Sequence, residues 1–300
     1  MRSQPHGAPI GAGAWDSLFS GGPVPLTLEA YGCLQSFAVL FSGGLDSTAV
    51  PLVIGPHTSG DIHLLTYKHI YGALVNDWSK RHIPELRAIL GDRVEHHLVD
   101  HTRIWNQIGA LRMVPDMARY HSNFVVCLGC HAAMMTHIIT YCLEKNVSNV
   151  FICSSVGGEY AVMSMATTRI KKGRFYEKFG IRYNAPLLDL GMRKDEERAL
   201  LRSHNIDPGW GRRRSHNGFQ PICLLGFQHA LDIVIDFHTT YNPAQVSRWL
   251  DDRMPAMERI IRETLLAKGL DPDELVARNK AVYAEEEARI QVVRSRTSGA

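Results

Sequence analysis

Short apolar runs alternate with longer amphipathic stretches over the first two thirds of the chain. The runs typical of buried strands are residues 37–41, 61–67, 93–99, 149–154 and 183–188. The stretches with the apolar spacing of helices are residues 78–90, 128–144 and 193–203. Because strands that alternate with helices favour crossover connections, this order predicts an α/β fold, a parallel sheet with helices on both faces.

The rest of the chain has a different pattern. After Asn205 the strand pattern stops, and residues 224–290 predict helices broken at three prolines: Pro243, Pro255 and Pro272. Residues 1–25 hold five Gly and four Pro, a composition that predicts a flexible leader. We therefore expect three parts: a leader at 1–29, an α/β domain at 30–205 and a helical C-terminal region at 206–300.

Composition is that of an ordinary globular protein. The chain is 45% hydrophobic and 21% charged, with a formal net charge of +3, which neither indicates nor excludes a nucleic-acid partner. Its longest apolar runs, such as Phe37–Phe41 and Val147–Cys153, are shorter than the ~20 residues of a spanning helix. The first residues lack the apolar segment of a signal peptide. These features predict a cytoplasmic protein with no membrane partner.

The most informative segment is Ser42-Gly43-Gly44-Leu45-Asp46-Ser47, between an apolar strand and a helix. Two glycines let backbone N–H groups approach a phosphate, and a helix N-terminus favours its charge. Ser42 and Ser47 add hydroxyl donors. A carboxylate such as Asp46 beside a polyphosphate needs Mg²⁺ to hold or a proton to take. The Gly-Lys-Ser/Thr of a Walker A loop is absent, so this is a different phosphate loop.

This loop resembles the PP-loop of the N-type ATP pyrophosphatases, enzymes that cleave ATP between the α and β phosphates. The resemblance covers about residues 35–205, since Pro186-Leu187-Leu188 followed by Lys194 is similar to the late strand and helix of that superfamily. It implies a Rossmann-like PP-loop domain at 30–205 that uses ATP and Mg²⁺, with Asp46 catalytic. The ATP-binding residues that it implies are Ser42, Gly43, Gly44, Asp46, Ser47, Thr66, Tyr67 and Lys194, with strand 61–67 holding adenine largely through its backbone.

Three of the six cysteines have a spacing that points to chemistry. Cys127 and Cys130 form a Cys-x-x-Cys pair just before the long predicted helix, and Cys223 follows 93 residues after Cys130. At this spacing two thiolates can face one point, which is metal-ligand or redox geometry. Cys33, Cys142 and Cys153 lie in or beside apolar runs and predict inert packing.

This arrangement resembles the PP-loop tRNA thiolases, which carry a Cys-x-x-Cys and a third cysteine roughly ninety residues later. The resemblance implies that Cys127, Cys130 and Cys223 ligate a 4Fe-4S cluster, or that Cys127 and Cys223 are a nucleophile and persulfide pair. It implies a cysteine desulfurase as sulfur donor. The product would be a thiolated purine base or nucleotide, as in 6-thioguanine biosynthesis, or a thiolated tRNA base. The spacing does not separate the two cysteine chemistries.

Other interpretations of the same residues stay open. A zinc site would take a fourth ligand from His131 or His229. The loop also resembles that of the 7-cyano-7-deazaguanine synthases, which deliver nitrogen, although their cysteine-dense zinc motif is absent here. A non-catalytic nucleotide-binding protein is the third alternative, and a homodimer is compatible with each.

Four further features are weaker. Glu159, in a loop after the fourth predicted strand, is a candidate for placing Mg²⁺ or substrate. Arg212–Arg214 and Lys171–Arg174 are basic runs that could face phosphates or only solvent. His63, His69, His96 and His97 show no ligand spacing with cysteines or carboxylates, so we expect ordinary strand or surface residues.

The charge of the C-terminal region bears on the substrate. Residues 251–300 hold ten Asp and Glu against nine Lys and Arg. A segment that docks tRNA usually has a basic excess. The balance favours a small purine-like substrate without excluding tRNA.

Overall fold

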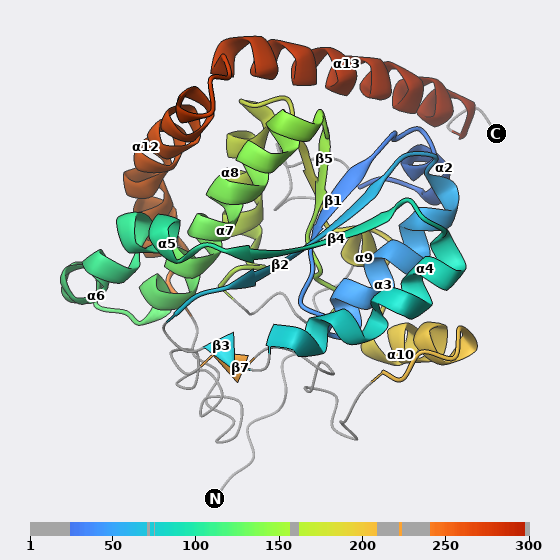
Figure 1. The fold of residues 1–300 in the computed structure, drawn as a ribbon, viewed down its shortest axis with the longest axis horizontal. Coiled ribbons are helices and arrows are strands. Elements are labelled where there is room, and N and C mark those ends of the chain that lie inside the picture. The colour runs from blue at the N-terminus through green and yellow to red at the C-terminus, as the bar shows by residue number, and fades with distance from the viewer. Residues whose placement is uncertain are drawn as a thin grey trace, which may run out of the picture.

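Five strands form one parallel sheet in the order β4-β2-β1-β5-β6 (Figure 1). Their bounds are β1 Phe37–Leu40, β2 Ile62–Lys68, β4 Val94–Asp100, β5 Asn149–Phe151 and β6 Arg182–Asn184. The computed structural model describes residues 25–70, 73–74, 76–156, 162–208, 222–223 and 241–297, and the structural statements below concern these residues. The leader predicted at 1–29 lies outside them up to residue 24. The predicted parallel α/β fold is confirmed.

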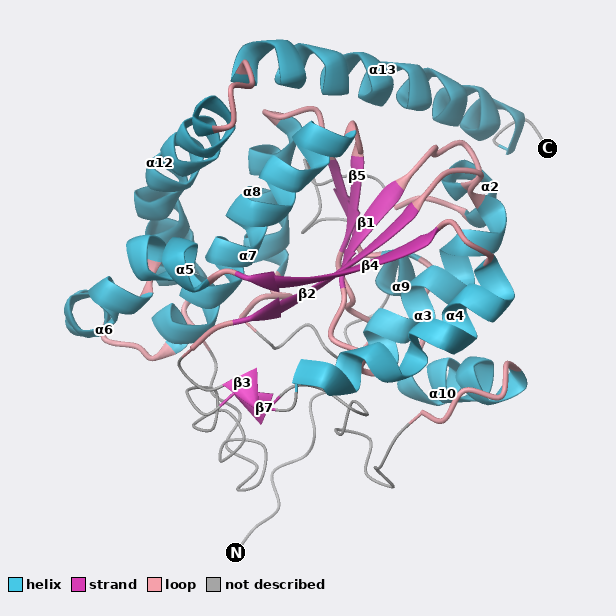
Figure 2. Ribbon diagram, in the orientation of Figure 1, coloured by secondary structure: helices cyan, strands magenta, loops and turns pink. Residues whose placement is uncertain are grey.

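Helices cover both faces of the sheet (Figure 2). Side chains alternate across a strand, so Ala38 packs into one core cluster while its neighbours Phe37 and Val39 pack into the other. The cluster of Ala38 contains the buried residues of α5 Thr102–Ile108, α7 Phe124–Lys145, α8 Ala166–Glu177 and α12 Pro243–Ala267. The cluster of Phe37 contains those of α2 Leu28–Tyr31, α3 Leu45–Ile54, α4 Ile83–Leu90 and α10 Lys194–Ser203.

Short elements complete the connections. They are the 3₁₀ helices η1 Gly55–His57, η2 Asn76–His82 and η3 Ala110–Arg112, the helices α6 Met113–Tyr120 and α9 Pro186–Asp189, and the strands β3 Ala73–Leu74 and β7 Ile222–Cys223. β3 and β7 pair antiparallel, with Ala73 opposite Cys223. A strand in the region after residue 205 was not predicted.

Three boundaries differ from the sequence predictions for identifiable reasons. The strand predicted at 183–188 ends at Asn184, because Pro186 at the N1 position begins α9 and cannot donate to a ladder. Pro255 lies inside α12 and does not end it, since buried Met257, Ile260 and Ile261 hold the following turns in the core. α7 begins at Phe124, so the Cys-x-x-Cys pair lies inside this helix and not before it.

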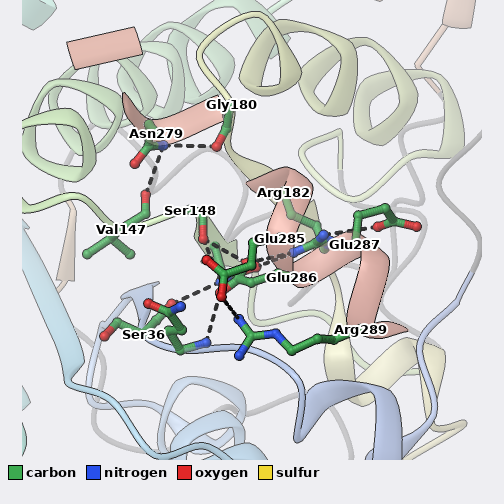
Figure 3. A network of polar contacts seen from close by, with 12 residues as sticks. Ser36, Val147, Ser148, Gly180, Arg182, Asn279, Glu285, Glu286, Glu287 and Arg289 are labelled. Carbon is green, nitrogen blue, oxygen red and sulfur yellow. Dashed lines mark hydrogen bonds and ion pairs between the residues drawn. The ribbon is translucent and has the colours of Figure 1, made fainter. Parts of the chain in front are cut away.

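The C-terminal helix α13 Pro272–Thr297 runs along the amino-terminal edge of the sheet, and its far end lies by α2 (Figure 1). Asn279 Nδ2 donates to the carbonyls of Val147 (3.3 Å) and Gly180 (2.9 Å), in the connections before β5 and β6. Glu286 accepts from Ser148 Oγ at 2.7 Å (Figure 3). α13 is thus joined to the sheet by specific polar contacts.

One helix in the described part of the chain is long and apolar enough to cross a membrane by length and composition. It is α7, and 67% of its most apolar stretch is buried inside the fold. Its apolar character is therefore that of a core helix.

Candidate active site

The strand order creates a crevice at the carboxyl edge of the sheet. The chain adds β2 and β4 on one side of β1 and then crosses to add β5 and β6 on the other. The connections that follow β1 and β5 therefore leave in opposite directions, and ligands of open α/β sheets bind at such a switch point. The predicted phosphate loop follows β1 and so lies at this crevice.

The phosphate loop is held by its own hydroxyl groups. Ser47 Oγ donates to the Gly44 carbonyl at 3.1 Å and lies 3.1 Å from Ser42 Oγ. The Gly44 N–H donates to Ser42 Oγ at 3.2 Å, and Thr48 Oγ1 donates to the Gly44 carbonyl at 2.9 Å. Gly44 is the N-cap of α3 and has no side chain that could cap the helix. The backbone N–H groups of the first turn, at the positive end of the helix dipole, therefore face the crevice.

Gly43 is required at its position for two reasons. Its φ of +75° lies in the left-handed region, and a Cβ there would lie 2.5 Å from the Cα of Ser79. Ser79 belongs to η2, which therefore packs directly on the loop. Any side chain at residue 43 would push these two segments apart.

Asp46 and Lys194, predicted from distant segments, meet in the structure. Asp46 lies in the first turn of α3 and Lys194 in the first turn of α10, and the Lys194 ammonium forms an ion pair with Asp46 Oδ1. Glu197, three residues further along α10, lies 3.7 Å from the same ammonium. Two carboxylates and one lysine thus line the crevice beside the phosphate loop.

Glu197 is a functional candidate that the sequence did not indicate. Its side chain is fully buried, and burial together with the Asp46 carboxylate raises its pKa above the ordinary value. The signal available in the sequence was its position one helical turn after Lys194, in a helix that otherwise seemed only amphipathic.

The far wall of the crevice comes from the segment after β5. The buried hydroxyl of Ser154 has no hydrogen-bond partner among the residues that the structure describes, and the Ser155 hydroxyl lies beside the Glu197 carboxylate. Cys153 Sγ donates to the Leu40 carbonyl at 3.4 Å, and burial, then the nearby Asp46 carboxylate, raises its pKa well above the ordinary value. Cys153 is a packed thiol, as expected, whereas the Ser154 hydroxyl is available to a ligand.

Thr66 and Tyr67 lie on β2 but turn their side chains into the protein. Thr66 Oγ1 donates to the Phe41 carbonyl at 2.8 Å and lies 2.9 Å from His96 Nε2. Tyr67 is buried, with its hydroxyl 3.1 Å from His137 Nδ1. A contact of these residues with adenine would have to use their backbone.

The cysteine pair lies at the same edge of the sheet, beyond β2 and β4. Cys127 and Cys130 are half-buried and one turn apart on α7. His101 follows β4, and its Nδ1 donates to the Lys68 carbonyl at 2.8 Å. Its Nε2 is therefore unprotonated and faces Cys130 Sγ at 3.3 Å.

The environment of His101 keeps this imidazole neutral. It is fully buried, and burial, with the nearby His69 ring, lowers its pKa to about 4. A neutral imidazole with its lone pair on a thiol accepts a hydrogen bond from it, which orients the Cys130 sulfur. With a pKa this low, His101 is too weak a base to take the thiol proton. The sequence contained no signal for this contact, because 29 residues separate His101 from Cys130.

For the third cysteine, Cys223, the structure describes the position of the backbone. Cys223 pairs with Ala73, five residues after the end of β2, so its strand belongs to the carboxyl side of the sheet. The thiolate donors and the i, i+3 spacing of the α7 pair are compatible with an iron–sulfur or zinc centre. Among the alternative ligands, His131 is half-buried with its buried Nδ1 unpartnered in the described structure, and desolvation lowers its pKa well below the ordinary value.

The remaining predicted residues are the two basic runs, Glu159 and His229. In the basic run Lys171–Arg174, Lys171 pairs with Asp251 at 2.5 Å, Lys172 is fully buried and Arg174 is exposed, so the three cations do not share one surface. Glu159, Arg212–Arg214 and His229 lie outside the described residues.

Comparisons with known proteins give weak likenesses. No protein-family model and no curated protein matches the chain. Among solved structures it is similar to NMN synthetase from Francisella tularensis, with 11% identity, 75% of this chain and 90% of that chain covered, and a TM-score of 0.42. It is also similar to the U34-tRNA thiolase NcsA from Methanococcus maripaludis, solved with its 4Fe-4S cluster, with 15% identity, 75% and 73% coverage and a TM-score of 0.42.

A third similar structure is a predicted subunit of tRNA methyltransferase from Methanocaldococcus jannaschii. Identity is 14%, 64% of this chain and 100% of that chain are covered, and the TM-score is 0.30. Neither family nor activity follows from likenesses of this size, so the geometry of the site carries the functional argument.

Proposed function

We propose that this protein is an ATP-dependent sulfur transferase that activates a carbonyl or lactam oxygen of its substrate as an adenylate. The observation that carries the proposal is the shared location of two groups. The phosphate loop with Asp46 and Lys194 follows β1, and the pair of Cys130 and His101 follows the neighbouring strands at the same sheet edge. β2 lies between β1 and β4, so the ends of these two strands are about 10 Å apart across the sheet, two strand spacings of about 4.8 Å.

The first step would occur at the phosphate loop. The substrate oxygen attacks the α-phosphorus of ATP and the bond to the β-phosphate breaks, releasing pyrophosphate. Backbone N–H groups at the start of α3 and the ammonium of Lys194 stabilise the leaving charge. Asp46 and Glu197 offer the carboxylate oxygens that Mg²⁺ prefers, and the ion would neutralise phosphate charge when bound.

The second step would use the cysteines. Sulfur attacks the activated carbon, the carbon–oxygen bond breaks, and AMP leaves. His101 Nε2 accepts a hydrogen bond from the Cys130 thiol and orients its sulfur. Cys127, Cys130 and Cys223 supply the sulfur ligands, and their thiol protons would be released when a metal binds. Three thiolates suit a 4Fe-4S cluster, which when bound would supply an iron open to sulfide. A persulfide on Cys127 or Cys223 is the alternative sulfur carrier.

The near balance of acidic and basic residues at 251–300 favours a small purine-like base or nucleotide over tRNA. A cysteine desulfurase is the proposed sulfur source. Nitrogen delivery, as in a nitrile-forming enzyme, differs only in the second step.

Paired variants of the anaerobically purified protein test the two steps separately. Asp46→Asn is expected to lower pyrophosphate release by at least about 100-fold with an unchanged melting temperature. Cys130→Ala is expected to retain pyrophosphate release but to form no thiolated product, detected by mass spectrometry, and to lose iron and labile sulfide.

The matched controls are Asp92→Asn, an exposed carboxylate, and Cys33→Ala, a half-buried thiol on the opposite helical layer. Both should behave as wild type. Normal ATP cleavage by Asp46→Asn would remove the loop from the reaction. A colourless protein that retains zinc and releases pyrophosphate without sulfur incorporation would support nitrogen delivery instead.

A further inference from the structure

A second group of metal-ligating side chains lies away from the candidate active site. β2 and β4 pair in register with His63 opposite Glu95, and His97 follows Glu95 on the same face of β4. His63 and His97 were expected to be ordinary strand or surface residues without ligand spacing to a carboxylate, and more than thirty residues separate His63 from the other two along the chain. Parallel pairing of the strands brings them together.

The distances within this His63–Glu95–His97 cluster match a metal site. Glu95 Oε2 lies 3.3 Å from His63 Nδ1 and 3.2 Å from His97 Nε2, and the three ligand atoms lie within 4.8 Å of one another. Ligands bound tetrahedrally to zinc at 2.0–2.1 Å are about 3.3–3.4 Å apart. Two of the three separations therefore already have the value that a zinc ion would impose.

A fourth polar group approaches from the helix above. The hydroxyl of Tyr141, in the second half of α7, lies 3.0 Å from both His63 Nδ1 and His97 Nε2. The cluster therefore joins the central part of the sheet, its edge strand β4 and the longest core helix at one point.

The cluster is accessible to ions from the solvent side, and its third ligand, His63, is buried in the fold. The side chain of His63 is 5% exposed, whereas Glu95 is 41% and His97 37% exposed. A buried imidazole fixes the position of the centre, and the two half-open ligands leave a path for the ion and room for a water molecule. His63 is the second residue of β2, so the cluster lies toward the amino-terminal end of the strands, whereas the phosphate loop and Cys130 lie at the carboxyl edge.

We propose that His63, Glu95 and His97 bind one zinc ion, with water as the fourth ligand, and that this ion fastens the edge strand β4 to β2. The donor set of two imidazoles and one carboxylate suits a borderline divalent cation. The role is structural, because the cluster is at the opposite end of the strands from the phosphate loop.

Zinc and cobalt binding to the full chain test this site. The Cys127→Ser/Cys130→Ser double variant removes the competing thiolate centre and serves as the background. After chelator treatment it should bind one equivalent of Zn²⁺, with a rise of about 3 °C or more in melting temperature at saturating zinc. Co²⁺ should give the visible absorption of a tetrahedral site without a thiolate charge-transfer band.

His97→Ala and Glu95→Gln in this background should weaken binding at least about 10-fold and abolish the thermal shift. His57→Ala, which removes an exposed imidazole elsewhere, should change neither. The proposal is overturned if the background variant shows no zinc-dependent stabilisation, or if His97→Ala binds zinc as tightly as the background does.

Discussion

At the scale of single residues, two fully buried charged side chains differ in whether a group of opposite charge pairs with them. Glu286 is fully buried, and its carboxylate pairs with Arg182 Nη1 at 3.1 Å. Other hydrogen-bond donors also contact this carboxylate. Lys172 is also fully buried, but its Nζ donates only to the Met163 carbonyl at 3.2 Å, and no carboxylate pairs with it among the described residues. An ammonium without a counter-charge in the core is a cost to the fold.

Lys172→Met should therefore stabilise the protein at neutral pH. Burial lowers the pKa of Lys172 to about 7, whereas the unfolded value is about 10.4. A depressed folded pKa means that the penalty is absent above about pH 10 and grows as the pH falls, reaching its full size below about pH 7. The variant should gain up to about 4 kcal/mol in free energy of unfolding at pH 7, and the gain should shrink toward pH 10.

Urea unfolding of wild type and Lys172→Met from pH 6 to pH 10 measures this gain. The neighbouring Lys171→Met is the control, because Lys171 pairs with Asp251 at the surface. It should change stability by no more than about 1 kcal/mol over this range. A gain for Lys172→Met that does not vary with pH would assign the effect to packing and not to the charge.

At the scale of elements, the connection between β1 and α3 is the most constrained segment of the site. Gly43 combines a positive φ with direct contact to η2, and hydroxyl groups fix the residues around it. The loop therefore has little freedom to admit a side chain.

Gly43→Ala should impair both folding and ATP binding. The left-handed backbone costs an alanine about 1 kcal/mol, and the 2.5 Å approach to Ser79 adds about 1–3 kcal/mol because backbone must move. We expect a loss of about 2–4 kcal/mol in unfolding free energy and a raised KM for ATP, measured by urea unfolding and pyrophosphate release.

Gly269→Ala separates these two causes. Gly269, after the end of α12, also has a positive φ, +74°, but a Cβ there would meet nothing within 4 Å. Its loss should be about 1 kcal/mol with normal ATP kinetics. Equal effects at both positions would show that η2 yields freely and that contact with Ser79 is unimportant.

Particular elements show what the sequence could and could not predict. The strands of the sheet and the phosphate loop were predictable, since apolar runs and Gly-Gly turns are local signals. The resemblance to PP-loop enzymes implied that Lys194 and Asp46 both bind ATP, but the ion pair between them was not predicted. The neighbours of Cys130 and of His63 were not predictable, because strand pairing and helix packing join residues whose separation along the chain carries no signal.

At the scale of the whole molecule, α12 and α13 surround the sheet without closing its carboxyl edge (Figure 1). Trp249 and Leu250 of α12 are buried in the cluster that contains α7, and α13 lies along the opposite, amino-terminal edge. Loss of a contact between α13 and the sheet should therefore lower the stability of the fold without changing the reaction at the phosphate loop.

Glu286→Ala is the test of this separation. Glu286 accepts from Ser148 Oγ at 2.7 Å, from the Gln35 N–H at 2.8 Å and from Arg182 Nη1 at 3.1 Å (Figure 3). Its removal leaves a buried guanidinium and several donors without this acceptor, so unfolding free energy should fall by about 3–5 kcal/mol. Glu285→Ala, next to it but exposed, loses only a 3.9 Å pair with Arg289 and should change stability by about 0.5 kcal/mol or less. Pyrophosphate release per folded molecule should be normal in both variants at a temperature well below unfolding. A large loss of turnover in folded Glu286→Ala would show instead that the two edges of the sheet are coupled.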